Sequence, residues 1–340
     1  MNWAALLDGL AAHDAEGAAG RANLCGAGLL ALRELGAGDE LLQTRAASWV
    51  QGLTPAPPAQ AWPVGDAWAG RFGRRAAWPA YRALFAEWLM REGGPLVLAQ
   101  ALPQLWPGAG AAGLQAVVRT AAAVRTGHRS EVADALAYWA CRWMPLPASS
   151  AGPVAEPGAR RRAPAPTDDP VAVLRTLRAV DSPARRLDAR LQAAARDGHV
   201  ARVLGRLVID ERTPARLSAA AASACAGSGD PVARLLVCAT HGVRVLSNFV
   251  DEPQQAWQAW AGVFAHAAVA ARWQPRPAVP LRPWSELTAA ALACGDALTV
   301  ACVESCRAEE QAHARPGQTL WRVAAAQALA VAALRPGAPR

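Results

Sequence analysis

Lysine is absent from this chain of 340 residues, so all 35 of its basic residues are arginines. Without a side-chain amine, the protein can use neither Schiff-base chemistry nor a lysine general base. Asparagine is scarce as well, and Ile209 is the single isoleucine. Together these shortages are typical of a GC-rich coding bias.

Residues that favour β-strands are also few. One isoleucine and two tyrosines stand against a 53% hydrophobic content that is mostly alanine and leucine. Alanine and leucine have high helix propensity, whereas β-branched and aromatic residues favour strands. We therefore expect a helical protein with a sizeable core.

Dense clusters of positive charge are nearly absent, although the formal net charge is +8. Nucleic-acid binding depends on clustered cations that release phosphate counterions. Here the arginines are scattered among acids, and the one dense run, Arg160–Arg162, lies in a proline-, alanine- and glycine-rich stretch typical of a solvated linker. We expect no nucleic-acid partner.

The chain lacks CxxC pairs, a signal-peptide pattern and any long apolar run. Its seven cysteines are an odd number, which argues against a complete disulfide framework. Apolar stretches fall short of the roughly 18 residues that cross a bilayer. We expect a reduced, cytoplasmic setting and no membrane insertion.

Helical periodicity dominates the rest of the chain. The predicted fold is all-α, an irregular multi-helix bundle without strand pairing. Its two helical lobes, residues 1–146 and 171–336, are joined by a flexible proline-rich linker, residues 147–170. Amphipathic spacing and helix-boundary residues predict helices over Trp3–Leu10, Cys25–Leu35, Pro79–Glu92, Leu96–Leu105, Ala111–Thr126, Ser130–Trp143, Val171–Val180, Pro183–Asp197, Val200–Ile209, Pro214–Ala226, Pro231–Phe249, Pro253–Trp273, Trp284–Ala293, Asp296–His313 and Leu320–Leu334.

Generic sequence motifs give little evidence for a catalytic or metal site. Gly108–Gly113 matches GxGxxG, but Trp106-Pro107 precedes it instead of a strand, so we interpret it as the small-residue start of a helix. No two of the six histidines are three or four residues apart, as two metal ligands on one helix would be. His241 and His266 lie in apolar helices and are expected in the core.

Several segments taken together resemble the questin oxidase-like family. They are Leu102–Gly108 (LPQLWPG), Leu114–Arg119 (LQAVVR), Glu131–Trp139 (EVADALAYW), Asn23–Ala27 (NLCGA) with Leu32–Gly36 (LRELG), Leu235–Leu246, and Asp296–Cys306. The likeness spans essentially the whole chain. The family includes fungal oxygenases that act on anthraquinone-type polyketides, and many bacterial proteins.

The resemblance implies an oxidoreductase with a non-haem metal, namely iron, held by histidines and a carboxylated lysine, and possibly NADPH as a second cofactor. At the matching positions this chain has Leu24, Gln115, Leu235, Leu298 and Ala301. Leucine and alanine offer no lone pair and a glutamine amide is a weak donor, so we expect the metal centre to be lost. Of the family's motif histidines, only His241 is retained.

If the family's geometry persists, these positions line one buried apolar pocket, with Cys25, Cys238 and Cys302 beside them and Gln115 and His241 as its polar groups. Three hypotheses follow. The first is an oxidoreductase acting on a hydrophobic, aromatic, polyketide- or anthraquinone-like substrate without the usual metal. The second is a non-catalytic binding or accessory protein. The third is a replacement zinc site made by Cys25, Cys238, Cys302 and His241.

Overall fold

The computed structural model describes residues 2–17, 20–147, 167 and 169–334. Within these ranges it contains sixteen α-helices and one two-stranded sheet, which confirms the all-α prediction. The expectation of no strand pairing was wrong at one place, because β1 (His13–Gly17) pairs antiparallel with β2 (Leu53–Pro55). Residues 148–166 and 168 of the predicted linker, Arg160–Arg162 among them, lie outside the described residues.

With two exceptions, the helices before the linker start or end close to the predicted boundaries. They are α1 (Trp3–Ala11), α2 (Cys25–Glu34), α3 (Asp39–Val50), α4 (Trp78–Glu92), α5 (Gly94–Leu105), α6 (Gln115–Thr126) and α7 (Arg129–Cys141), with short 3₁₀ turns η2 (Trp68–Arg71), η3 (Arg75–Ala77) and η4 (Trp106–Gly108).

The helices after the linker range from 6 residues in the shortest to 18 in the longest. They are α8 (Pro170–Arg175), α9 (Leu187–Asp197), α10 (His199–Leu204), α11 (Thr213–Gly227), α12 (Pro231–Leu246), α13 (Pro253–Ala270), α14 (Trp284–Ala293), α15 (Ala297–His313) and α16 (Leu320–Ala333), with η5 (Ser247–Phe249). Proline in the first turn marks the start of α11, α12 and α13, where its missing N–H costs no intrahelical bond.

Helix α3 is one of the two exceptions, since no pattern in the sequence predicted it. Its buried residues are only Leu42 and Ala46, so the apolar stripe is too narrow to stand out. The other exception is α6, which begins at Gln115 and not at Ala111. Ala112, Gly113 and Leu114 all have positive φ and form a tight turn that excludes helix there.

The GxGxxG segment is therefore a turn, not a helix start. A Cβ on Gly108 would lie 2.1 Å from the Trp143 ring, and one on Gly110 would lie 2.8 Å from the Leu146 side chain. Its first two glycines allow close packing against residues 143–146, which accounts for the motif without a nucleotide.

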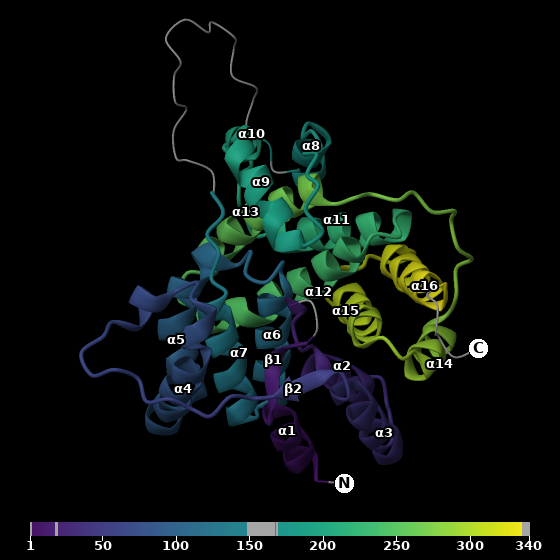
Figure 1. Ribbon diagram of the computed structural model, residues 1–340. Coiled ribbons are helices and arrows are strands. Elements are labelled where there is room, and N and C mark those ends of the chain that lie inside the picture. Colours follow the sequence, from purple (N-terminus) through teal and green to yellow (C-terminus); the bar gives the residue numbers. More distant parts are fainter. Residues whose placement is uncertain (1, 18–19, 148–166, 168, 335–340) are drawn as a thin grey trace, which may run out of the picture.

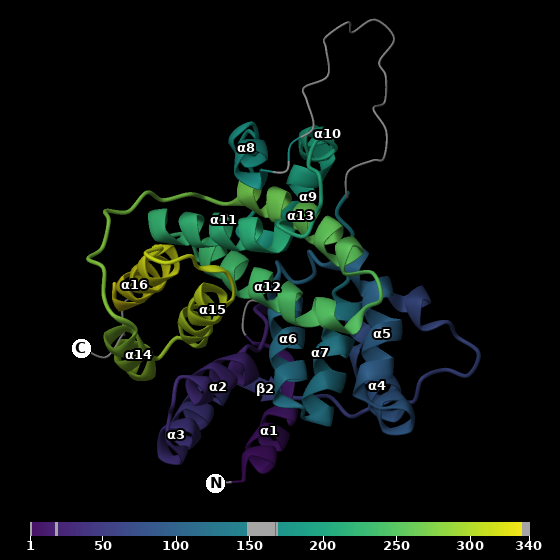
Figure 2. The same ribbon diagram turned by 180° about the vertical axis from the view of Figure 1, so that it is seen from behind.

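One hydrophobic core joins the helices of both predicted lobes. Helix α6 packs against α12, and α2 packs against α15, so helices from either side of the linker alternate in space. Helix α12 lies in the middle, with α4, α5 and α7 to one side and α14, α15 and α16 to the other (Figures 1 and 2). The aromatic stripe of Trp257, Trp260 and Phe264 on α13 is buried in this core. In the part of the chain that is described, no helix has both the length and the apolar character to cross a bilayer.

Helix α2 approaches α15 closely because Gly28 has no side chain. A Cβ at this position would lie 2.7 Å from both Ala297 Cβ and the Trp49 ring. We expect Gly28→Ala to lower the free energy of unfolding by about 1–3 kcal/mol through overpacking, measured by urea denaturation.

The matched control is Gly9→Ala on α1, where nothing lies within 4 Å of the added Cβ. There the substitution should raise stability by up to about 1 kcal/mol, since alanine is the better helix former. Equal effects of the two substitutions would contradict the packing argument.

Candidate functional site

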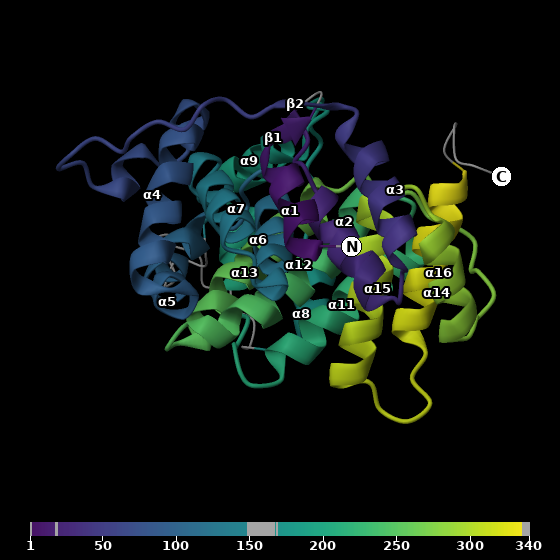
Figure 3. The same ribbon diagram turned by 90° about the horizontal axis from the view of Figure 1, so that it is seen from below.

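Five helices begin at one cleft of about 750 Å³. Its lining includes the first residues of these helices, namely Cys25 of α2, Gln115 of α6, Leu187 of α9, Pro231 of α12 and Ala297 of α15. We name it the five-helix cleft. Seen from below, α2, α6, α12 and α15 gather in the middle of the molecule (Figure 3).

Four of the five positions that the resemblance matches to the family's metal ligands line this cleft. Leu24 precedes the first turn of α2, Gln115 opens α6, Leu235 lies in the second turn of α12, and Leu298 lies in the first turn of α15. Cys25 lines it as well. Residues far apart in the sequence thus meet because their helices start at the same place.

The other expected residues, Ala301, Cys238, His241 and Cys302, are buried away from the cleft lining. The Cys302 thiol instead shares hydrogen bonds with Cys225 and Cys306. No group of three or more histidine, cysteine or acidic side chains within the described ranges is arranged to hold a metal. The zinc hypothesis therefore has no support, because its four proposed ligands are not brought together.

His241 belongs to a buried ionic network. Its Nδ1 donates to Glu309 Oε1 at 2.9 Å, and its Nε2 accepts from Arg125 Nη1 at 3.2 Å. Arg125 also makes two bonds to the Glu304 carboxylate, at 2.6 and 3.1 Å. Of the two polar residues expected at the pocket, only Gln115 lines the cleft. His241 instead cross-links α6, α12 and α15.

The Glu309 carboxylate shows how strong this network is. Burial by itself would raise the pKa of Glu309, but the hydrogen bond from His241 and the positive charge of Arg244, whose Nε donates to the same carboxylate at 2.7 Å, outweigh it. The pKa of Glu309 is consequently well below its usual range. This group is a fixed anion that holds helices together.

A non-haem metal does not fit the residues at the cleft. Leu24, Leu235 and Leu298 have no donor atom. The Gln115 amide is engaged at both ends, with Oε1 accepting from the Ala22 backbone N–H at 3.1 Å and Nε2 donating to the Ala112 carbonyl at 2.9 Å. No free ligand set remains at these positions.

Cys25 lines the cleft, and the buried carboxyl of Glu131 acts on it electrostatically. Burial raises the pKa of the Cys25 thiol to about 11, with Arg119 and Glu131 acting as nearby charges. Burial also raises the pKa of Glu131 to about 7, and its Oε1 has no partner among the described residues. Cys25 is therefore a thiol at neutral pH and a poor nucleophile.

The cleft also has a charged side that the sequence patterns did not reveal. Arginines at 21, 185, 186 and 190 line it together with aspartates at 188, 230 and 296. Arg186 pairs with Asp188 at 2.7 Å, and Asp296 pairs at 3.2 Å with Arg234, which is buried behind the lining. The cleft is thus amphipathic, with leucines on one part of its wall and charges on another.

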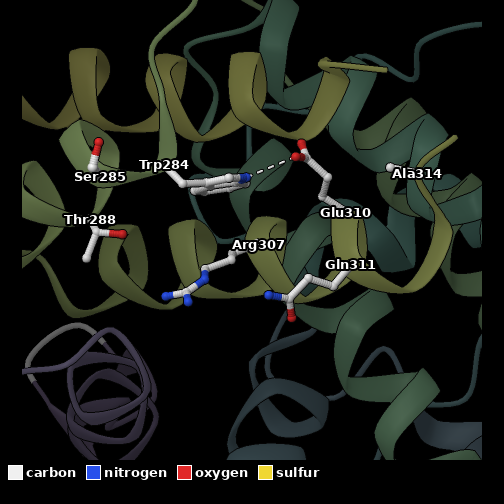
Figure 4. A pocket seen from close by; sticks show the side chains of 7 residues that line it. All are labelled: Trp284, Ser285, Thr288, Arg307, Glu310, Gln311 and Ala314. Atoms are coloured by element: carbon white, nitrogen blue, oxygen red, sulfur yellow. Dashed lines mark hydrogen bonds between the residues drawn. The ribbon is translucent and has the colours of Figure 1, made fainter. Parts of the chain in front are cut away.

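A second pocket of about 590 Å³ lies between α14 and α15 (Figure 4). Trp284 Nε1 donates to Glu310 Oε1 at 2.9 Å there, and Ser285, Thr288, Arg307 and Gln311 complete a polar wall. It is an exposed groove that contains none of the residues marked by the resemblance. The five-helix cleft is the stronger candidate.

No protein-family model and no curated protein matches this sequence. The function of the chain is therefore inferred from the residues of the cleft.

The raised pKa of Glu131 predicts a pH-dependent stability. The folded-state pKa of Glu131 is above its ordinary value of 4.5. The contribution of this group to the free energy of unfolding is therefore fully present below pH 4.5 and is lost as the pH rises through about 7. Glu131→Gln should therefore stabilise the protein at pH 8, by about 3 kcal/mol at most, and change it little at pH 5. Urea unfolding at the two pH values measures this.

Glu87→Gln on the exposed face of α4 is the control, because the Glu87 side chain is 70% exposed. We expect its stability to follow that of the unmodified protein at both pH values. A Glu131→Gln variant that is equally stabilised at pH 5 and pH 8 would contradict the assignment.

Proposed function

We propose that this protein is a questin oxidase-like protein in which the position of the metal centre has become a binding cleft for a small hydrophobic or aromatic molecule. The observation that supports it is the meeting of Leu24, Gln115, Leu235 and Leu298 at one cleft of about 750 Å³. This volume lies in the range of known small-molecule sites. These are four of the positions that the resemblance matches to metal ligands.

A non-catalytic role accounts best for the side chains at the cleft. The leucines contribute apolar surface, each worth about 1.5–3 kcal/mol when fully buried by a ligand. They contribute no acid, base or nucleophile, and the neighbouring Cys25 thiol has a raised pKa. We therefore favour a binding or accessory protein over an oxidoreductase.

The setting we propose is cytoplasmic, with neither nucleic acid nor membrane as partner. All seven cysteines are free thiols, which supports a reducing compartment. Many arginines are engaged by acids, as in the pairs of Arg125 with Glu304 and Arg142 with Glu16, so they do not form a free basic surface.

Leu298→Trp tests the cleft directly. Leu298 is half-buried, so an indole there can extend into the cleft without crowding the core. We expect at least about tenfold weaker binding of the neutral fluorescent probe N-phenylnaphthylamine, which corresponds to about 1.4 kcal/mol. Fluorescence titration measures the affinity.

Leu96→Trp on α5 is the matched control, since Leu96 is 57% exposed and remote from the cleft lining. Its affinity for the probe should be unchanged. Equal affinity in the Leu298→Trp variant would move the binding site elsewhere. Oxygen uptake with NADPH and a panel of anthraquinones should show no turnover, and turnover would favour the oxidoreductase hypothesis.

A further inference from the structure

Arg190 is a buried cation that forms no ion pair with the residues that the structure describes. It lies on α9, is 8% exposed and lines the five-helix cleft. Its Nε and Nη1 have no hydrogen-bond partner within the described residues. An arginine stays protonated at neutral pH, and a buried charge that is neither paired nor hydrogen-bonded is costly. This arrangement is unfavourable unless an acceptor reaches the guanidinium.

Asp230, the acid whose negative charge acts on Arg190, does not satisfy it. Burial lowers the pKa of Arg190, and the negative charge of Asp230 offsets only part of this. Asp230 is already used as a helix cap, because its Oδ1 accepts from the Val232 N–H at 2.8 Å and its Oδ2 accepts from the Arg272 N–H. The two side chains form no ion pair in the described part of the chain.

The N-terminal ends of the helices add to the positive potential that Arg190 creates in the five-helix cleft. The N-termini of α2, α6, α9, α12 and α15 all reach the cleft, and each has free backbone N–H groups with a partial positive charge. Side-chain caps from Asn23, Asp188 and Asp230 satisfy some of these donors. The side chain of Leu114, which precedes α6, provides no such cap.

From this geometry we propose that the ligand is an organic acid, whose apolar body lies against Leu24, Leu235 and Leu298 and whose carboxylate binds the Arg190 guanidinium. The assignment rests on the proposed function and specifies its ligand class. A guanidinium offers parallel N–H donors that match a carboxylate, and such charge-assisted bonds are stronger than neutral ones. The ligand would supply the acceptors that Arg190 lacks.

A displacement experiment tests the carboxylate. The protein is loaded with N-phenylnaphthylamine, and naphthoate or naphthalenemethanol, which share one ring system, is titrated against it. We expect naphthoate to displace the probe at concentrations about 10- to 100-fold lower, the range given by one charge-assisted interaction. Arg190→Met should abolish this preference, measured as the ratio of the two displacing concentrations in the same variant, so that a change in probe affinity does not affect the comparison.

Arg196→Met is the matched control, because Arg196 is on the same helix and exposed. It should keep the preference. Urea denaturation checks that the Arg190→Met variant is folded, and its ligand-free form should be at least as stable as the unmodified protein, since an unpaired buried charge is removed. Arg190→Lys, which retains the charge without the fork of donors, should keep a reduced preference.

The outcomes separate the two proposals. Probe binding without any preference for naphthoate, or a preference that survives Arg190→Met, overturns the organic-acid assignment alone. Displacement by inorganic phosphate at the same concentration as naphthoate overturns it too, because the site would then bind a simple anion. Failure of the probe to bind the unmodified protein overturns the proposed function and this assignment together.

Discussion

Close approach of helices through small side chains is the constraint on which the rest of this structure depends. Gly28 lets α2 touch α15 at Ala297, and a Cβ on Gly242 of α12 would lie only 3.1 Å from Ala121 of α6. Helix axes can approach to the short end of the usual range only where the contacting side chains are small. The alanine-rich composition provides such contacts, and they bring helices from both ends of the chain together.

Convergence of five helix starts is the direct consequence. Each start brings unsatisfied N–H groups and a positive dipole end, so a cleft built from them needs acceptors. Asp188 and Asp230 provide some of these as caps. Leu24, Leu235 and Leu298 share the same wall, and apolar surface there strengthens any charge interaction by excluding water. The cleft therefore favours an amphipathic ligand.

The ionic network around His241 lies beside this region without opening into it. Arg125 of α6, His241 of α12 and the acids Glu304 and Glu309 of α15 bind one another at 2.6 to 3.2 Å. Such a network fixes the relative positions of three of the five helices. The position of His241 is thus accounted for by this network, although the resemblance alone had suggested a place at the pocket.

The sequence by itself determined the helical class and most helix positions, because alanine, leucine and the prolines at 214, 231 and 253 act locally. The resemblance also selected four residues that line one cleft. Pairing of β1 with β2 and the turn before α6 were not predictable, since the first depends on the helices between the strands and the second on positive φ at Ala112 and Leu114. Nor did anything local distinguish Arg190 from the other arginines. Whether a charge is buried and paired depends on neighbours from other helices, and only the tertiary structure decides which neighbours those are.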